Sequence, residues 1–201
     1  MFLRPGDFLL YSSGEDIIIY LNSKILKFIG EEQMNFTIEK ARPSDAAEIL
    51  AYLRKVGSET DNLSFGAEGI QNTVEEEAAF ISSVNNSSKD VMYLAKSGGR
   101  ILGIASLSTS SRERLRHRSE LGISVLKEAW GRGIGNSLML KIIDFARNTA
   151  GADIIHLTVR SDNKRAIRLY EKHGFKKTGT FPGYMKINGE LVDCDLMALK
   201  L

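Results

Sequence analysis

Three glycines lie between a β-like segment and a long helical pattern, and this arrangement constrains the fold more than any other feature of the sequence. Hydrophobic residues alternate over 121–125, as in a half-buried strand, and recur at helical spacing over 134–150. Gly131, Gly133 and Gly135 occupy the junction. The N-terminus of a helix carries unpaired N–H groups and a positive partial charge, and glycines let the backbone approach an anion closely. The sequence therefore predicts a strand–turn–helix unit that binds a diphosphate group.

Two familiar nucleotide-binding turns do not match this segment. A P-loop has Lys and then Ser or Thr after its second glycine, whereas Gly135 is followed by Asn136 and Ser137. A dinucleotide-binding turn has the spacing G-x-G-x-x-G, but its last position falls on Asn136 or Leu138 here. The remaining alternatives are a diphosphate site of another kind and a turn without a ligand.

The remaining patterns predict a mixed α/β domain. Periodicity and turn residues indicate strands at 35–41, 91–96, 101–107, 121–125, 154–159, 175–187 and 191–199, and helices that begin near 43–45, 73, 134 and 163. We expect Gly57 to end the first helix, and Asp45 and Glu48 to form a capping box at its start. Tight turns make the outer strands antiparallel, whereas the strand–helix–strand unit around the glycines should be parallel. The expected fold is a mixed, mostly antiparallel sheet with a central parallel β–α–β unit and helices on both faces.

The first 33 residues do not fit this pattern. They read as two short pieces of strand or helix, 8–11 and 17–29, and they lack the basic start and unbroken apolar stretch of a signal peptide. A second methionine, Met34, directly precedes the first strand of the domain pattern. We therefore expect a compact domain at 34–201, preceded by an extension at 1–33. One explanation is that translation properly starts at Met34; the alternative is an appended element that packs on the domain.

Composition is that of an ordinary soluble globular protein, with 43% hydrophobic and 26% charged residues in 201. A net charge of +2 is too small to indicate nucleic-acid binding, and no apolar run has the length of roughly 18 residues that a membrane helix needs. The single cysteine, Cys194, excludes an internal disulfide and fits a reducing compartment. The three histidines are too far apart, and too far from other ligands, to form a metal site. We expect a cytoplasmic protein with no metal and with neither nucleic acid nor membrane as a partner.

A second motif, N-x-x-A-x-x-L-Y-x-x-x-G-F, spans residues 163–175. Asn163, Ala166 and Tyr170 are three or four residues apart and therefore share one helix face. Gly174 should end this helix, and Phe175 should pack back on it. The simplest alternative is an amphipathic helix with a buried tyrosine.

Together, the two motifs resemble the signatures of the GNAT N-acetyltransferase superfamily. The first, V-x(4)-[QR]-x-x-G-x-[GA], begins at Val125 and ends at Gly135, with Trp130 in place of the usual Gln or Arg. The resemblance implies acetyl-CoA as cosubstrate, held by backbone groups of the strand, the glycine-rich turn and the second motif. The implied coenzyme-binding residues are Ile123, Val125, Trp130, Gly131, Arg132, Gly133, Ile134, Gly135, Asn136, Asn163 and Ala166.

The resemblance also implies direct transfer of the acetyl group to a primary amine, without an acyl-enzyme. Tyr170 would protonate the departing thiolate, and a backbone N–H of the strand that ends at Val125 would stabilise the oxyanion. Glu120 is the candidate base; the alternatives are an exposed, solvated Glu120 and a water relay to bulk solvent. Glu59 and Asp193 are candidates for attracting the cationic amine.

The acceptor class stays broad at this point. The C-terminal pattern resembles bacterial family members related to the ribosomal-protein N-terminal and polyamine acetyltransferases. The expected acceptor is therefore the amine of a small molecule or the N-terminal amino group of a protein, and relatives of this kind often form homodimers. The alternative to an enzyme is a sensor or regulatory module that binds acyl-CoA without turnover.

Overall fold

The computed structural model describes residues 9–13, 16–21, 24–28 and 35–201. The chain divides into two compact units between Asn35 and Phe36. In the first unit, a three-stranded antiparallel sheet consists of β1 (Leu9–Ser13), β2 (Asp16–Leu21) and β3 (Lys24–Phe28). The part of 17–29 that the structure describes is therefore strand and not helix, while positions 8, 22–23 and 29 lie outside the described residues.

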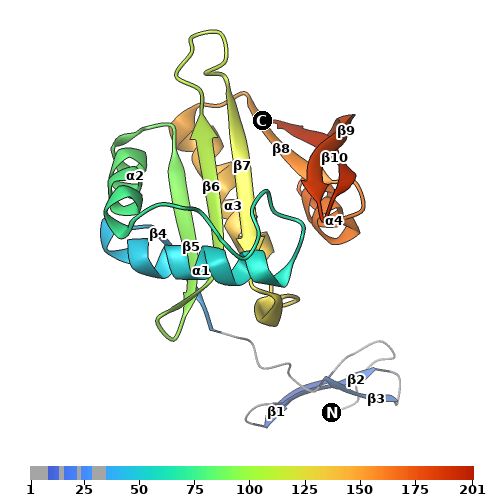
Figure 1. Cartoon of the computed structure of the whole chain (residues 1–201). Helices are drawn as coiled ribbons and strands as arrows, with labels where there is room; N and C mark the ends of the chain where they lie inside the picture. The colour runs from blue at the N-terminus through green and yellow to red at the C-terminus, as the bar shows by residue number, and fades with distance from the viewer. Residues whose placement is uncertain (1–8, 14–15, 22–23, 29–34) are drawn as a thin grey trace. The chain divides into compact units, whose positions relative to one another are not determined.

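The second unit is built on a seven-stranded sheet with the order β4-β5-β6-β7-β8-β10-β9 (Figure 1). Its strands are β4 (Thr37–Lys40), β5 (Val91–Ser97), β6 (Arg100–Thr109), β7 (Arg118–Val125), β8 (Ile154–Arg160), β9 (Lys176–Ile187) and β10 (Glu190–Lys200). Neighbouring strands are antiparallel except for β7 and β8, which run parallel and are joined through α3. The predicted mixed sheet with its central parallel unit is confirmed.

Helices cover both faces of this sheet, as Figure 1 shows: α1 and α2 lie over one face and α3 over the other. The helices are α1 (Ala46–Glu59), α2 (Val74–Asn86), α3 (Ile134–Phe145) and α4 (Lys164–Lys172). Short 3-10 turns at Pro43–Asp45 and Lys127–Ala129 precede α1 and α3, and a π-helical turn at Ala146–Ala150 extends α3. Within the described part of the chain, no helix has both the length and the apolarity needed to cross a membrane.

One capping box lies at the start of α2. Thr73 and Glu76 cap each other at the start of α2, with N···O distances of 2.8 and 3.1 Å. Asp45 and Glu48 do not form the box that their spacing predicts, because the Glu48 carboxylate instead accepts the N–H of Ile101 at 2.8 Å. Glu48 therefore joins α1 to the start of β6, a contact between distant parts of the chain that a local motif does not reveal.

Gly57 was expected to end α1, and this prediction is wrong, since the helix continues to Glu59. The residue is needed for close packing instead. A Cβ atom built at Gly57 would lie 2.0 Å from the carbonyl oxygen of Gly66, so only glycine lets the following loop pass this close to the helix. The loop from 60 to 73 is thereby held against α1, where it forms part of the wall of the site described below.

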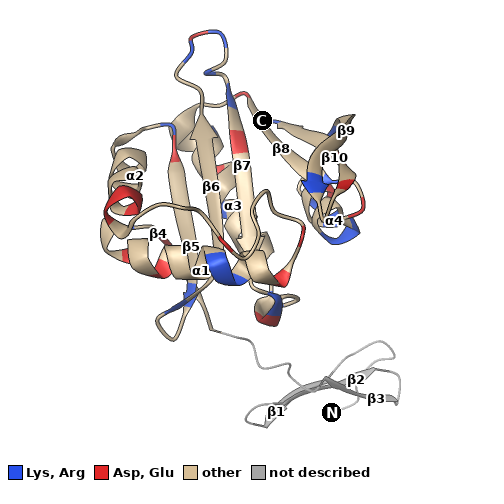
Figure 2. Ribbon diagram, in the orientation of Figure 1, with Lys and Arg blue, Asp and Glu red and all other residues tan. Residues whose placement is uncertain are grey.

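The hydrophobic core lies between the helices and the sheet on both faces. Fully buried residues include Ile49 and Ile81 from α1 and α2, Leu94 from β5, and Leu138 and Ile142 from α3. Charged residues gather on the helices and loops, and the central strands carry few of them (Figure 2). The arginine-rich loop 110–117 leads into the beginning of β7, at the opposite end of that strand from the glycine-rich turn.

Candidate active site

The site begins where two parallel strands separate. β7 and β8 pair only over Arg118–Glu120 and Ile154–His156. Beyond these residues each strand continues, β7 to Val125 and β8 to Arg160, but the ladder between them ends. The sheet is therefore open along the second half of β7, and the edges of both strands border the opening.

Backbone groups of β7 point into this opening. Leu126 N–H bonds the carbonyl of Leu102 on β6 at 2.9 Å. Because hydrogen-bonded and non-bonded pairs alternate along an antiparallel ladder, Ile123 and Val125 occupy non-bonded positions toward β6. Their N–H and C=O groups are directed to the side where β8 has diverged, which is the geometry an extended ligand needs to add as a strand.

A cavity of about 880 Å³ fills the opening and extends under the loop that follows α1. Most residues proposed from the sequence line it. These are Glu120, Ile123, Val125, Trp130, Gly131, Gly133, Ile134, Gly135, Asn136, Asn163, Ala166 and Tyr170. Two separate motifs, about 30 residues apart in the sequence, therefore meet in one cavity.

The glycine-rich turn directs the N-terminus of α3 into the cavity. Gly131 and Gly133 have φ angles of 80° and 82°, in the left-handed region that favours glycine. The first intrahelical bond of α3 runs from Ser137 N–H to the Gly133 carbonyl at 3.0 Å. The N–H groups of residues 134–136 therefore point beyond the helix end, where the positive end of the helix dipole favours an anion.

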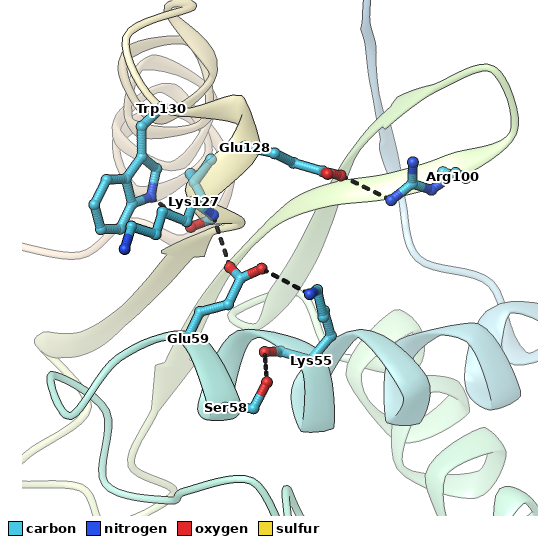
Figure 3. Close-up of polar contacts among 8 residues, drawn as sticks. Lys55, Ser58, Glu59, Arg100, Lys127, Glu128 and Trp130 are labelled. Atoms are coloured by element: carbon cyan, nitrogen blue, oxygen red, sulfur yellow. Dashed lines mark hydrogen bonds and ion pairs between the residues drawn. The ribbon is translucent and has the colours of Figure 1, made fainter.

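Trp130, which departs from the family pattern, closes one side of the turn. Its indole N–H donates to the carbonyl of Val125 at 2.8 Å (Figure 3). The guanidinium of Arg165 lies 4.3 Å from the centre of the Trp130 ring. The Val125 carbonyl is thus already bonded within the protein. The Val125 N–H and both backbone groups of Ile123 are left for an extended ligand.

The second motif brings a buried phenol to the cavity wall. Asn163 caps α4 by accepting the N–H of Ala166 at 3.1 Å, and the helix ends at Lys172, followed by the C-cap His173 and by Gly174, whose φ is 89°. Tyr170 is 7% exposed, and its ring packs against Phe175 with 5.9 Å between centroids. Burial raises the pKa of Tyr170 to about 12, so the phenol keeps its proton throughout the physiological pH range.

Glu120 lies at the point where β7 and β8 part. It is exposed, lines the cavity, and is the partner of His156 in the last pair of the parallel ladder. Burial lowers the pKa of His156 despite the neighbouring carboxylate of Glu120. Strand alternation places the side chains of Glu120 and Ile123 on opposite faces of β7, yet both residues line the cavity. This is possible because β7 is not paired with β8 beyond Glu120, so the cavity borders the edge of β7.

Three of the proposed residues are not in the cavity wall. Arg132 is exposed on the outer side of the turn. The carboxylate of Glu59 accepts the backbone N–H of Lys127 at 2.7 Å and pairs with Lys55 at 3.3 Å, so it joins α1 to the segment before α3 (Figure 3). Asp193 accepts the N–H of Gly183 at 2.8 Å across the terminal hairpin. The last two carboxylates make structural contacts, and their placement does not support the role of attracting the amine.

The cavity wall also contains polar residues that sequence reasoning missed. Glu77 is only 2% exposed, although it is a carboxylate. A signal was available, because Glu77 lies four and seven residues before Ile81 and Val84 on the buried face of α2. Ser124 of β7 also lines the cavity and bonds the buried hydroxyl of Tyr52 at 3.0 Å, and this pairing across 72 positions leaves no local signal.

Comparison with known proteins agrees with these observations. The chain matches the acetyltransferase (GNAT) family over residues 58–175. It is 37% identical over 100 residues to the L-amino acid N-acetyltransferase AaaT of Escherichia coli strain K12. It is 35% identical over 95 residues to the N-alpha-acetyltransferase RimI of Mycobacterium tuberculosis. These alignments cover 50% and 47% of this chain, and the chain spans 62% and 58% of the two relatives.

A solved structure extends the similarity to most of the second unit. The acetyltransferase of the GNAT family from Streptococcus pneumoniae superposes with a TM-score of 0.81 at 34% identity. The superposition covers 83% of this chain and 100% of that one. The family match includes the separated strands, the glycine-rich turn and the buried tyrosine, and it covers more than half of the sequence. The chain belongs to the GNAT acetyltransferase family.

Proposed function

We propose that this protein transfers an acetyl group from acetyl-CoA to a primary amine. The observation that carries the proposal is the convergence on one cavity of three features: an unpaired strand edge, a glycine-bordered helix N-terminus and a buried, protonated phenol. The first two suit the pantetheine and the diphosphate of a coenzyme, and the third suits a leaving group that must gain a proton. Relatives named as N-acetyltransferases support the same reaction.

Coenzyme binding would use backbone groups for the most part. The N–H groups at the start of α3 would bond the diphosphate oxygens, and the edge of β7 at Ile123 and Val125 would bond the pantetheine amides. Arg165, stacked on Trp130 at the cavity wall, supplies a positive charge close to the turn. A coenzyme bound in this way would have its thioester near the point where β7 and β8 separate.

The chemistry requires an ammonium nitrogen to lose two protons and the sulfur to gain one. Glu120 would accept the first proton from the incoming ammonium, directly or through water, so that the neutral nitrogen attacks the thioester carbon. As the carbon–sulfur bond breaks, the Tyr170 hydroxyl would donate its proton to the thiolate, and the second proton of the nitrogen would return through water to the Tyr170 oxygen as the amide forms. A hydroxyl with a pKa of about 12 is fully protonated at neutral pH, as a general acid must be.

Release of free thiol from acetyl-CoA, measured with a panel of amines, tests this proposal. We expect acetyl-CoA to bind and at least one primary amine to accelerate thiol release above the rate of hydrolysis. If acetyl-CoA binds but no amine accelerates thiol release, the protein is a binding module and the proposed transfer is wrong.

A further inference from the structure

The cavity wall contains a buried carboxylate that has no ion-pair partner among the described residues. Glu77 of α2 is 2% exposed and lines the cavity. Its one side-chain hydrogen bond comes from the neutral amide of Asn72, at 2.9 Å to Oε2. Within residues 35–201, no lysine or arginine forms an ion pair with it.

The elements that pack together around Glu77 contribute apolar side chains to the cavity wall. These are Leu53 and Val56 of α1, Phe80 of α2 and Met92 of β5, and both α1 and β5 contact α2. A carboxylate in such a wall has lost most of its hydration, and the amide of Asn72 replaces only part of it. A cationic group of a ligand would compensate the remaining charge.

The cations in the cavity wall do not fill this role. Among residues 35–201, the lining includes two arginines, Arg160 and Arg165. Arg160 bonds both carboxylate oxygens of Asp162, at 2.9 and 2.6 Å, and the carbonyl of Asp61 at 3.1 Å. Arg165 is stacked on Trp130 beside the turn. The charge that Glu77 requires must therefore come from the molecule that enters the cavity.

We infer that Glu77 binds a second cationic group of the acceptor, one that does not react. This inference rests on the proposed function and makes its substrate class more specific. Glu120 is the proposed acceptor of the proton of the reacting nitrogen, so the group that Glu77 holds as a cation is a second one. The acceptor is thus an amine that carries a second ammonium or guanidinium group, joined by an apolar spacer that lies against Leu53, Val56, Phe80 and Met92.

Two acceptors of equal length, hexylamine and hexamethylenediamine, test this inference because they differ only in the second ammonium group. Wild-type protein should acetylate the diamine with a kcat/KM about tenfold or more above that of hexylamine, the usual scale for a hydrogen bond to a charged group. Glu77→Gln keeps an acceptor for the Asn72 amide but removes the charge. It should raise KM for the diamine about tenfold, with kcat little changed, and leave hexylamine unaffected.

Glu75→Gln is the matched control, because Glu75 lies exposed on the same helix and loses the same charge. It should leave both acceptors unaffected. The inference is overturned if wild-type protein uses hexylamine as well as the diamine, if Glu77→Gln keeps the preference, or if neither amine is acetylated. The wild-type comparison is valid even if Glu77→Gln does not fold. Failure of the proposed function is a separate outcome, in which acetyl-CoA does not bind by calorimetry, or binds while no amine of the wider panel accelerates thiol release.

Discussion

Tyr170 combines nearly complete burial with a place on the wall of the cavity. These two properties suit a proton donor. Burial holds the hydroxyl in its neutral form, and the wall position would give its proton access to a bound thioester. The spacing of the second motif predicted that residues 163, 166 and 170 share one helix face, and the family resemblance implied the role of the tyrosine. The raised pKa could not be predicted, because it depends on packing by distant segments.

Removal of the hydroxyl should affect turnover far more than coenzyme binding. We expect Tyr170→Phe to lower kcat by about 10²-fold, the usual scale for loss of a general acid, because the thiolate must then leave unprotonated. The Kd for acetyl-CoA should stay within about twofold, since the backbone contacts remain. Thiol-release kinetics and calorimetry check both numbers. Unchanged turnover would remove Tyr170 from the mechanism.

The same pKa shift has a consequence for stability at high pH. Tyrosine has an ordinary pKa of about 10, and burial raises that of Tyr170 to about 12. Between these values the folded protein holds a proton that the unfolded chain has lost, so the free energy of unfolding falls as pH rises. Urea unfolding from about pH 8 to pH 11 should show a smaller loss in Tyr170→Phe than in wild-type protein. Equal losses would contradict the buried phenol.

Residues that bond across the fold were the hardest to interpret from sequence. Glu59 and Asp193 looked like free acidic groups, yet each accepts a backbone N–H, from Lys127 and Gly183 respectively. Such hydrogen bonds depend on how the fold brings loops together. In the sequence, an acidic residue that forms one cannot be distinguished from an acidic residue that is solvated. Glu77 was the detectable exception, because an acidic residue on the apolar face of a helix is unusual.

At the scale of elements, the glycine-rich turn and the start of α3 form the part of the site that depends on backbone conformation. The segment was predictable because a strand pattern, glycines and a helix pattern follow one another without interruption. Helix ends were less predictable. Gly57 looked like a helix stop, but the helix continues past it, and Gly57 packs closely against Gly66 of the loop that follows α1.

A side chain at Gly133 should prevent coenzyme binding. Valine is strained at a φ of 82° and would project where the diphosphate is expected. Gly99→Val is a matched control, because Gly99 has a φ of 80° in the β5–β6 turn, which does not line the cavity. Both variants should lose stability, but only Gly133→Val should lose affinity for acetyl-CoA by calorimetry. Equal affinity in the two variants would show that the turn is structural.

At the scale of the whole molecule, the parallel β–α–β unit and the terminal hairpin followed from the sequence, because both depend on neighbouring segments. The separation of β7 from β8 did not. The hydrogen-bonded pairing of β7 with β8 stops after Glu120 and His156, although both strands continue beyond these residues. No local sequence pattern marks the point where the pairing stops. The cavity is therefore a property of the assembled sheet.

We propose that residues 34–201 form a complete folding unit. The division of contacts between Asn35 and Phe36 supports this proposal. A chain that begins at Met34 should unfold within about 2 °C of the full chain and bind acetyl-CoA equally well, because its core and cavity are unchanged. Thermal unfolding of both chains provides the check. A large loss of stability would mean that the first 33 residues pack on the domain.

The proposed function requires that the cavity bind the coenzyme. Titration of the folded, full-length protein with acetyl-CoA in a calorimeter should show saturable binding to one site per chain, weakened in Gly133→Val and retained in Tyr170→Phe. Absence of binding to folded wild-type protein would contradict the central claim that the strand edge and the α3 N-terminus form a coenzyme site.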